Sequence, residues 1–239
     1  MPSRMASDMI KPLDRDSPRL RRIGLAMAAV IVGYGLFVAA LPTLLADGEA
    51  TPPWSVYRPI GLAILFAVPA LVAAIGAIRV VGPLLIAAGV ICLLQAFVSF
   101  SGVTLGFIVP GFVLILLGAG APSERAESSR TALAAGVLVI GLTLGAWVSL
   151  FALTEPRCYS FTRAADGTLV YTEVPATDAN LYGPVEISGE GGGCGSAEIT
   201  LQGLGVSGVL AVGAVVLAAS VPSRGRRPDP LGSASAAGP

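Results

Sequence analysis

The sequence contains no histidine and a single lysine, and these two absences remove most of the side chains on which enzymes rely. Without histidine the chain has no Ser-His or Cys-His nucleophile pair, no His-ligated haem and few ways to hold zinc. Lys11 lies in the polar N-terminal segment, which disfavours a Ser-Lys dyad or a Schiff base. We therefore predict no catalytic residue, no cofactor and no metal site, and we interpret the protein as a non-enzyme.

Charged residues are also scarce: they make up 13% of the chain, against 54% of apolar residues, and the mean hydropathy is +0.79. Soluble domains carry roughly 25% charge, so this composition indicates a membrane protein whose main partner is the lipid bilayer. The formal net charge is zero, which gives no basic field for nucleic acid. One lysine accompanies many arginines in a background rich in Ala, Gly and Val, which is typical of GC-rich bacterial genomes. We therefore expect a bacterial plasma membrane protein.

Long charge-free stretches define the candidate membrane spans, because about 20 apolar residues in a helix cross a hydrocarbon core of about 30 Å. Five stretches qualify: residues 23–46, 59–78, 80–123, 131–154 and 199–223. The third has 44 residues, about twice the length of one crossing, so we predict that it reverses between Ser99 and Gly102. The stretches contain no Asp or Glu, which excludes an intramembrane aspartyl protease and a carboxylate proton relay. The sequence thus predicts about six transmembrane helices.

The basic residues give the predicted orientation, since positively charged loops resist translocation. Twelve of the fifteen fall in segments that six crossings place on one side: Arg4, Lys11, Arg15, Arg19, Arg21, Arg22, Arg79, Arg125, Arg130, Arg224, Arg226 and Arg227. Only Arg58, Arg157 and Arg163 fall on the other side, so we predict that both termini are cytoplasmic. The pair Arg21-Arg22 resembles a twin-arginine export signal, but the apolar run of 24 residues after it is long enough to remain as an anchor.

These assignments divide the chain into five parts. They are a basic cytoplasmic tail at 1–22, transmembrane helices 1 to 5 at 23–153, an extracytoplasmic loop domain at 154–200, transmembrane helix 6 at 201–222 and a disordered cytoplasmic tail at 223–239. In the loop domain, apolar residues alternate with polar ones on both sides of Asp166-Gly167, which predicts two strands and a turn. Val185 and Ile187 predict a third short strand.

Cys158 and Cys194 bracket the loop domain, and the predicted orientation places both on the oxidising side of the membrane. We therefore predict a disulfide between them, which would stabilise so small a domain by about 4 kcal/mol in the chain-entropy model. The glycine-rich run 189–195 lacks the Lys-Ser/Thr of a phosphate loop and is interpreted as a flexible link. The predicted fold class is an all-α polytopic membrane protein with a disulfide-stapled, β-rich extracytoplasmic loop domain.

A few polar residues and prolines interrupt the apolar stretches. Cys92, Gln95 and Ser99 are spaced by three and four residues, so they share one helix face. We favour interhelical hydrogen bonding as the role of this face over the alternative that it lines a pathway. Pro69 and Pro110 predict helix kinks.

Two further patterns concern the helices themselves. Gly141 and Gly145 form a GxxxG step that predicts close packing of the fifth helix. Phe66, Val68 and Pro69 recur 41 residues later, which suggests that helices 2–3 and 4–5 are copies of one hairpin. The motifs give no support to homo-oligomerisation.

The absence of reactive groups, together with one exposed domain, favours an accessory or scaffold subunit whose outer loop, 154–200, contacts a protein partner or the cell envelope. The alternative is a small transporter or channel for an uncharged or lipid-like substrate, which would depend on the Gln95 face and on both prolines. The sequence does not decide between these two functions.

Overall fold

The computed structural model describes residues 18–45, 56–98, 102–121, 126–177 and 191–222. The helices in these residues are α1 (Pro18–Leu45), α2 (Tyr57–Arg79), α3 (Gly82–Val98), the 3-10 helix η2 (Gly102–Phe107), α4 (Ile108–Ala119), α5 (Ala126–Ala152) and α7 (Leu201–Ser220). The strands are β1 (Thr154–Arg163), β2 (Leu169–Val174) and β3 (Gly191–Ile199). The protein is therefore mostly helical, with one small sheet, as its sequence predicts.

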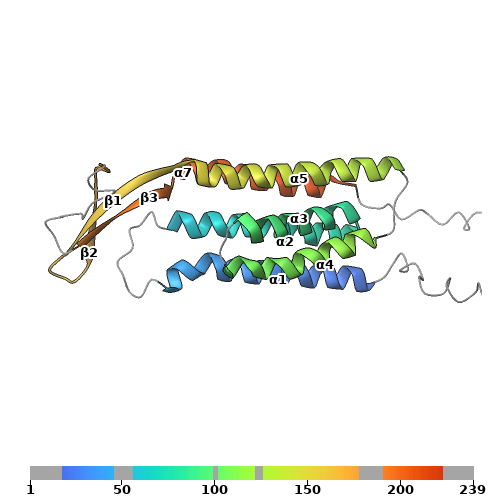
Figure 1. The fold of residues 1–239 in the computed structure, drawn as a ribbon, viewed down its shortest axis with the longest axis horizontal. Helices are drawn as coiled ribbons and strands as arrows, with labels where there is room; N and C mark the ends of the chain where they lie inside the picture. The colour runs from blue at the N-terminus through green and yellow to red at the C-terminus, as the bar shows by residue number, and fades with distance from the viewer. Residues whose placement is uncertain (1–17, 46–55, 99–101, 122–125, 178–190, 223–239) are drawn as a thin grey trace, which may run out of the picture.

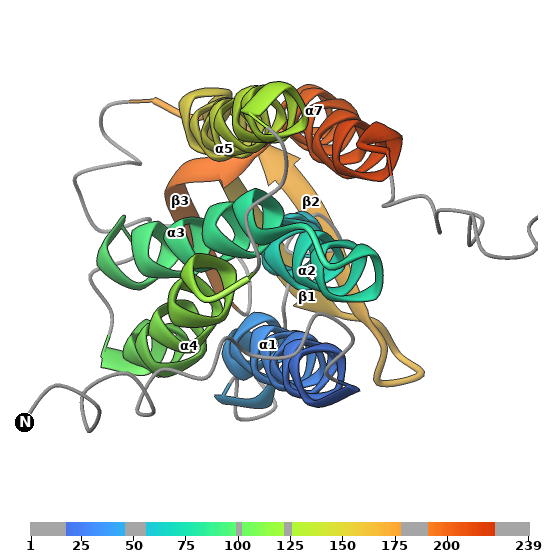
Figure 2. The same ribbon diagram turned by 90° about the vertical axis from the view of Figure 1, so that its right-hand side faces the viewer.

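The α-helices form a bundle of three layers, each two helices wide. Viewed along the bundle, α5 lies beside α7, α3 beside α2, and α4 beside α1 (Figure 2). Helices α1, α3 and α5 begin at the end of the bundle remote from the sheet, and α2, α4 and α7 end there (Figure 1). Successive helices therefore run in opposite directions, and α2 and α3 occupy the middle layer.

The burial of the helices matches their layers. In α2, 56% of the span is buried inside the protein, against 28% in α1 and in α7. The outer helix surfaces instead carry large apolar side chains with more than half of their area exposed, among them Val109, Leu116, Leu133, Val148 and Val209. So much exposed apolar surface suits contact with lipid, since soluble monomers rarely present large contiguous apolar patches.

In the part of the chain that the structure describes, four helices are long and apolar enough to cross a membrane: Pro18–Leu41, Tyr57–Arg79, Arg130–Ala152 and Leu201–Ser220. The prediction of six spans is not confirmed. The long stretch 80–123 does reverse, because α3 ends at Val98 and η2 begins at Gly102, but its two arms are short apolar helices. Splitting one stretch into two helices and a turn leaves each arm close to the shortest length that can span lipid.

Helices α3 and α4 approach closely through two pairs of glycines. A Cβ atom on Gly82 would lie 2.6 Å from the Gly118 carbonyl oxygen, and one on Gly89 would lie 2.6 Å from the Gly111 carbonyl oxygen. Both helices thus present a glycine every seven residues to the same antiparallel seam. The predicted GxxxG contact differs, because a Cβ on Gly141 would meet no atom within 4 Å.

The proposed hairpin duplication does not agree with the packing of the described helices. Helix α2 packs on α3, as a hairpin requires, whereas α4 packs on α3 and α1, and α5 packs on α7 and α3. Helices α4 and α5 lie in the two outermost layers of the bundle, on opposite sides of α3 (Figure 2). The repeated residues therefore lie in helices that are similarly apolar but have different neighbours.

The sheet continues two of the helices beyond the end of the bundle (Figure 1). Its strand order is β2-β1-β3, and both pairings are antiparallel. Strand β1 follows α5 almost directly, and β3 leads into α7 through Thr200. The Thr200 hydroxyl accepts a hydrogen bond from the Gly203 backbone N–H at 3.0 Å and donates one to the Leu153 carbonyl at 2.8 Å. Thr200 therefore caps α7 and ties it to the end of α5.

The glycine seam gives a first prediction. The Gly89→Ala substitution should lower the free energy of unfolding by about 1–3 kcal/mol, because the added methyl group must push α3 away from α4. Equilibrium unfolding in detergent micelles, followed by circular dichroism, would measure the change. The matched control is Gly141→Ala, where the new methyl group meets open space. Equal loss in both variants would show that the seam is not closely packed.

Candidate functional site

The polar face predicted on the third helix lies inside the bundle. The Cys92 side chain is fully buried and Gln95 is 2% exposed, while Ser99 falls outside the described residues. The Gln95 Nε2 atom donates a hydrogen bond to the Leu65 carbonyl oxygen at 2.9 Å. This bond joins α3 to α2, the two helices of the middle layer, and so provides the interhelical contact that the sequence favours for Gln95.

The partner of Gln95 is explained by Pro69, which lies in the middle of α2 and is buried. In an α-helix the Leu65 carbonyl would accept from the backbone N–H four residues later, which here belongs to a proline and is missing. A buried carbonyl left without a donor costs about 1–3 kcal/mol. The Gln95 amide supplies the donor that Pro69 removes, so two residues predicted separately form one unit.

The second predicted kink has a different setting. Pro110 is the third residue of α4, and α4 follows directly on η2. Pro110 therefore lies just after a 3-10 helix becomes an α-helix, near the middle of the arm that η2 and α4 form together.

Aromatic rings connect the polar pair to the rest of the bundle. The ring centroids of Tyr34 and Phe107 are 5.1 Å apart, those of Phe107 and Phe66 are 5.0 Å apart, and those of Phe66 and Trp147 are 6.0 Å apart. These residues belong to α1, η2, α2 and α5, so the row of rings crosses all three layers.

Three buried polar atoms have no hydrogen-bond partner among the described residues: Gln95 Oε1, Trp147 Nε1 and Ser207 Oγ. Two other polar side chains bond within their own helix, since Thr143 donates to the Val139 carbonyl at 2.8 Å and Ser149 to the Gly145 carbonyl at 2.8 Å. The sequence singled out Gln95 as part of a polar helix face, but could not show that its amide lies in the core.

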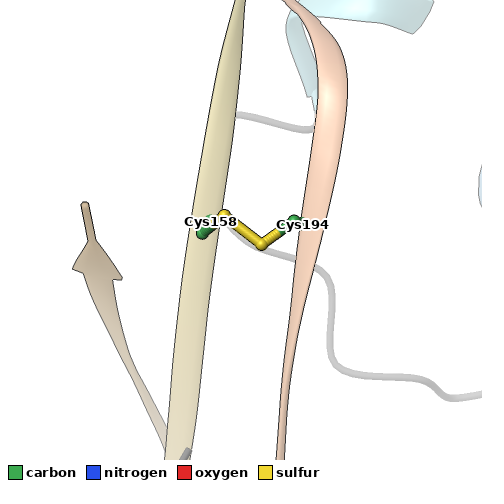
Figure 3. The surroundings of a disulfide bond; sticks show 2 residues. All are labelled: Cys158 and Cys194. Atoms are coloured by element: carbon green, nitrogen blue, oxygen red, sulfur yellow. A yellow bond between two sulfur atoms is a disulfide. The ribbon is translucent and has the colours of Figure 1, made fainter. Parts of the chain in front are cut away.

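The predicted disulfide between Cys158 and Cys194 is present (Figure 3). The two residues face each other in the register of β1 and β3, with their Cα atoms 4.0 Å apart. The bond therefore fastens the two strands that continue α5 and α7. Because those helices already hold the ends of the loop together, the disulfide adds less entropy-based stability than it would to a free loop.

The glycine-rich run is a correction. Residues 191–195, interpreted as part of a flexible link, form the first half of strand β3 (Gly191–Ile199), whereas the strand predicted at Val185 and Ile187 lies outside the described residues. Strand β3 has four glycines, which have low intrinsic strand preference, but β1 pairs with most of its residues in antiparallel register. Pairing with β1 and the disulfide thus outweigh local preference, which no local sequence signal could reveal.

Aromatic side chains of β1 cover the glycines of β3. A Cβ on Gly191 would lie 2.3 Å from the Phe161 ring, and one on Gly193 would lie 3.1 Å from the Tyr159 hydroxyl. Tyr171 on β2 joins the same sheet face, with ring centroids 6.1 Å from both Tyr159 and Phe161. Loss of hydration, followed by the neighbouring Tyr159, raises the pKa of the Tyr171 hydroxyl. This face therefore combines three half-buried rings with a glycine strand.

Charged side chains flank the rings on the same sheet. Arg157 on β1 lies 3.9 Å from the Glu155 carboxylate and 4.0 Å from that of Glu173. At the turn between β1 and β2, Asp166 accepts hydrogen bonds from the Thr168 hydroxyl and backbone N–H, which lower the pKa of its carboxyl. The predicted turn at Asp166-Gly167 therefore forms, and the described sheet surface is both aromatic and charged.

Comparisons with protein-family models, with curated proteins and with solved structures found no match for this chain.

A double-mutant cycle tests the unit formed by Pro69 and Gln95. Gln95→Met keeps the shape of the side chain but removes its amide, so it should cost about 1–3 kcal/mol of unfolding free energy. In a Pro69→Ala background, a backbone N–H again reaches the Leu65 carbonyl, and the cost of Gln95→Met should fall by about 1 kcal/mol or more. Unfolding in detergent measures all four proteins. Additive costs would contradict the coupling.

Proposed function

We propose that this protein is a membrane-anchored accessory or scaffold subunit that presents its outer sheet to a partner protein. One observation carries the proposal: the disulfide-linked strands β1 and β3 directly continue two packed membrane helices, α5 and α7. The sheet is joined to the bundle at two points, where β1 follows α5 and where β3 leads into α7. Hydrogen bonds from Thr200 to the Leu153 carbonyl tie these two points together, so the sheet is held in a fixed position at the end of the bundle. Such a domain is suited to presenting a surface.

We place the protein in a bacterial plasma membrane, with six crossings and with both termini in the cytoplasm. At 1.5 Å per residue in α-helix and 2.0 Å in 3-10 helix, α3 reaches about 25 Å, and η2 with α4 about 30 Å, close to the thickness of the hydrocarbon core. The orientation is supported by arginines at the helix ends remote from the sheet: Arg19, Arg21, Arg22, Arg79 and Arg130. The Arg79 guanidinium donates to the Val221 carbonyl there, joining the ends of α2 and α7.

The interior of the bundle also supports a scaffold. Its most polar predicted residue, Gln95, is used to complete the hydrogen bonding of α2, and Thr143 and Ser149 bond to their own helix. An interhelical contact such as the bond from Gln95 to Leu65 stabilises a membrane bundle by about 1 kcal/mol. The Gln95 amide nitrogen and the hydroxyls of Thr143 and Ser149 therefore have structural partners, whereas the sheet outside the bundle carries exposed side chains.

Photo-crosslinking in intact cells that express the chain tests this proposal. A photoreactive amino acid at Val170, which is 50% exposed on β2, should form a discrete adduct with one protein. The same group at Val148, 65% exposed on α5, is the matched control and should not form that adduct. Replacing Cys158 and Cys194 with alanine should weaken the Val170 adduct several-fold at equal protein level, and Gln95→Met should preserve it. No adduct from Val170 would contradict the proposal.

A second candidate function is a small transporter or channel for an uncharged or lipid-like substrate. One observation favours it: Gln95 Oε1 and Trp147 Nε1 are buried polar atoms without partners among the described residues, an acceptor and a donor that a neutral molecule can use.

Osmotic swelling of reconstituted vesicles in glycerol measures the entry of a small neutral solute. A transporter predicts faster swelling than in protein-free vesicles, lost in both Gln95→Met and Trp147→Phe. Swelling equal to that of empty vesicles would exclude this role for glycerol-sized solutes.

A further inference from the structure

Strand β3 forms one edge of the sheet, because the strand order is β2-β1-β3. Four of its first five residues are glycine, so β3 has almost no side chains of its own to shield the backbone groups along its outer edge. Natural proteins usually protect an edge strand with charged side chains, proline or a bulge, since an open edge pairs readily with another strand. The pairing of β3 with β1 is irregular opposite the segment from Glu155 to Arg157. The glycine half of β3 pairs regularly, and among the described residues its outer side is an open edge.

The register shows which backbone groups point outward. In an antiparallel pair, facing residues alternate between a wide, hydrogen-bonded pair and a narrow pair whose N–H and C=O groups point away from each other. The Cα distance of 4.0 Å between Cys158 and Cys194 identifies a narrow pair. Gly192, two residues earlier and opposite Ser160, lies in the next narrow pair. The outward donors and acceptors on this edge are therefore those of Gly192 and Cys194.

The rings of β1 extend towards this edge. Phe161 lies over Gly191, and Tyr159 over Gly193, because glycine leaves the space that a side chain on β3 would fill. A strand added beside β3 would therefore meet outward backbone groups and, on one face, aromatic rings that can contact its side chains. Main-chain bonds with side-chain contacts on alternate residues are the usual basis of strand addition.

The position of the rings argues against lipid as their partner. Tyr159 is five residues beyond the start of β1, which at about 3.3 Å per residue allows it to lie up to about 17 Å past the end of the bundle, since β1 runs at a slant to the helices (Figure 1). The headgroup layer of a bilayer adds only about 5–8 Å on each side of the hydrocarbon. The aromatic face is therefore better placed for a protein partner than for the headgroup layer.

Charge indicates the chemistry of that partner. Among the described residues of the loop domain, four are acidic, Glu155, Asp166, Glu173 and Glu198, against two arginines, Arg157 and Arg163. A second copy of the chain would bring the same acidic surface to the edge, and like charges oppose such pairing. A basic segment would be attracted to it.

We propose that the open edge of β3 binds an extended, basic segment of a partner protein as a fourth strand, through the backbone of Gly192 and Cys194. This inference rests on the proposed function, because it names the chemistry of the partner and the way in which the outer sheet holds it. The rings of Tyr159 and Phe161 contact the apolar side chains of the added strand, and the acidic loop domain attracts its lysines or arginines.

Peptide binding to the full chain in nanodiscs tests the proposal. The probe is a fluorescent ten-residue peptide of alternating lysine and valine, and its binding is followed by anisotropy. It should bind, whereas a matched peptide of glutamate and valine should not. The lysine–valine peptide with an N-methyl group on every backbone nitrogen keeps its charge but loses its donors along both edges, and should bind at least about tenfold more weakly. Equal binding of the methylated peptide would show charge attraction alone and overturn the proposal.

Variants locate the binding to the edge. Gly192→Pro removes the outward N–H but leaves the bonds of Gly191 and Gly193 to β1, so it should weaken peptide binding about tenfold. Gly192→Ala, the matched control, keeps the N–H and should bind like the natural chain. Hydrogen exchange should slow at Gly192 and Cys194 when the peptide is bound. Protection of other amides only, or no binding of the lysine–valine peptide, would overturn the inference.

Two outcomes separate this inference from the proposed function. If Gly192 is protected without peptide and the chain is dimeric, the edge is occupied by a second copy and the basic segment is excluded. If the Val170 crosslink persists unchanged in Gly192→Pro, the scaffold function stands and the partner binds elsewhere on the sheet. Loss of the crosslink in Gly192→Pro but not in Gly192→Ala supports both.

Discussion

Inside a bilayer, every backbone hydrogen-bonding group must find its partner within the protein, because lipid offers none. This requirement links several features of the bundle that otherwise look unrelated. Pro69 breaks the ladder of α2, and Gln95 of α3 repairs it with its amide at 2.9 Å. The bond can form only because α2 and α3 are neighbours in the middle layer. The end of α7 is completed in a similar way, since Arg79 at the end of α2 donates to the Val221 carbonyl that follows α7.

Helices α5 and α7, which form one outer layer of the bundle, set the position of the sheet. Their ends meet at Leu153 and Thr200, and the chain passes from helix to strand there with few intervening residues. The disulfide then holds β1 to β3 further along. An exposed domain fixed at two points loses little further freedom on binding, and such preorganisation improves affinity without additional contacts. This is the physical reason why we propose the sheet, and not the bundle interior, as the surface that binds a partner.

Strand β3 shows how tertiary pairing can reverse a local preference. Its glycines are poor strand formers and were interpreted as a link, yet β1 pairs with them and its aromatic rings occupy the space they leave. The resulting strand has backbone groups at its edge that few side chains cover. A segment that looks unstructured by composition therefore becomes an edge strand of the described sheet.

The sequence by itself determined the membrane character of the chain, the reversal near residue 100, the turn at Asp166 and the Cys158–Cys194 disulfide. These depend on local quantities: the length of apolar runs, the positions of charges and turn residues, and cysteines that bracket one loop. Only the tertiary structure decided the three-layer arrangement, the glycine seam of α3 and α4, the pairing of Gln95 with Leu65, and strand β3. Each of these joins residues from different segments, and the close approach of two helices or two strands depends on shapes and directions that no single stretch of sequence contains.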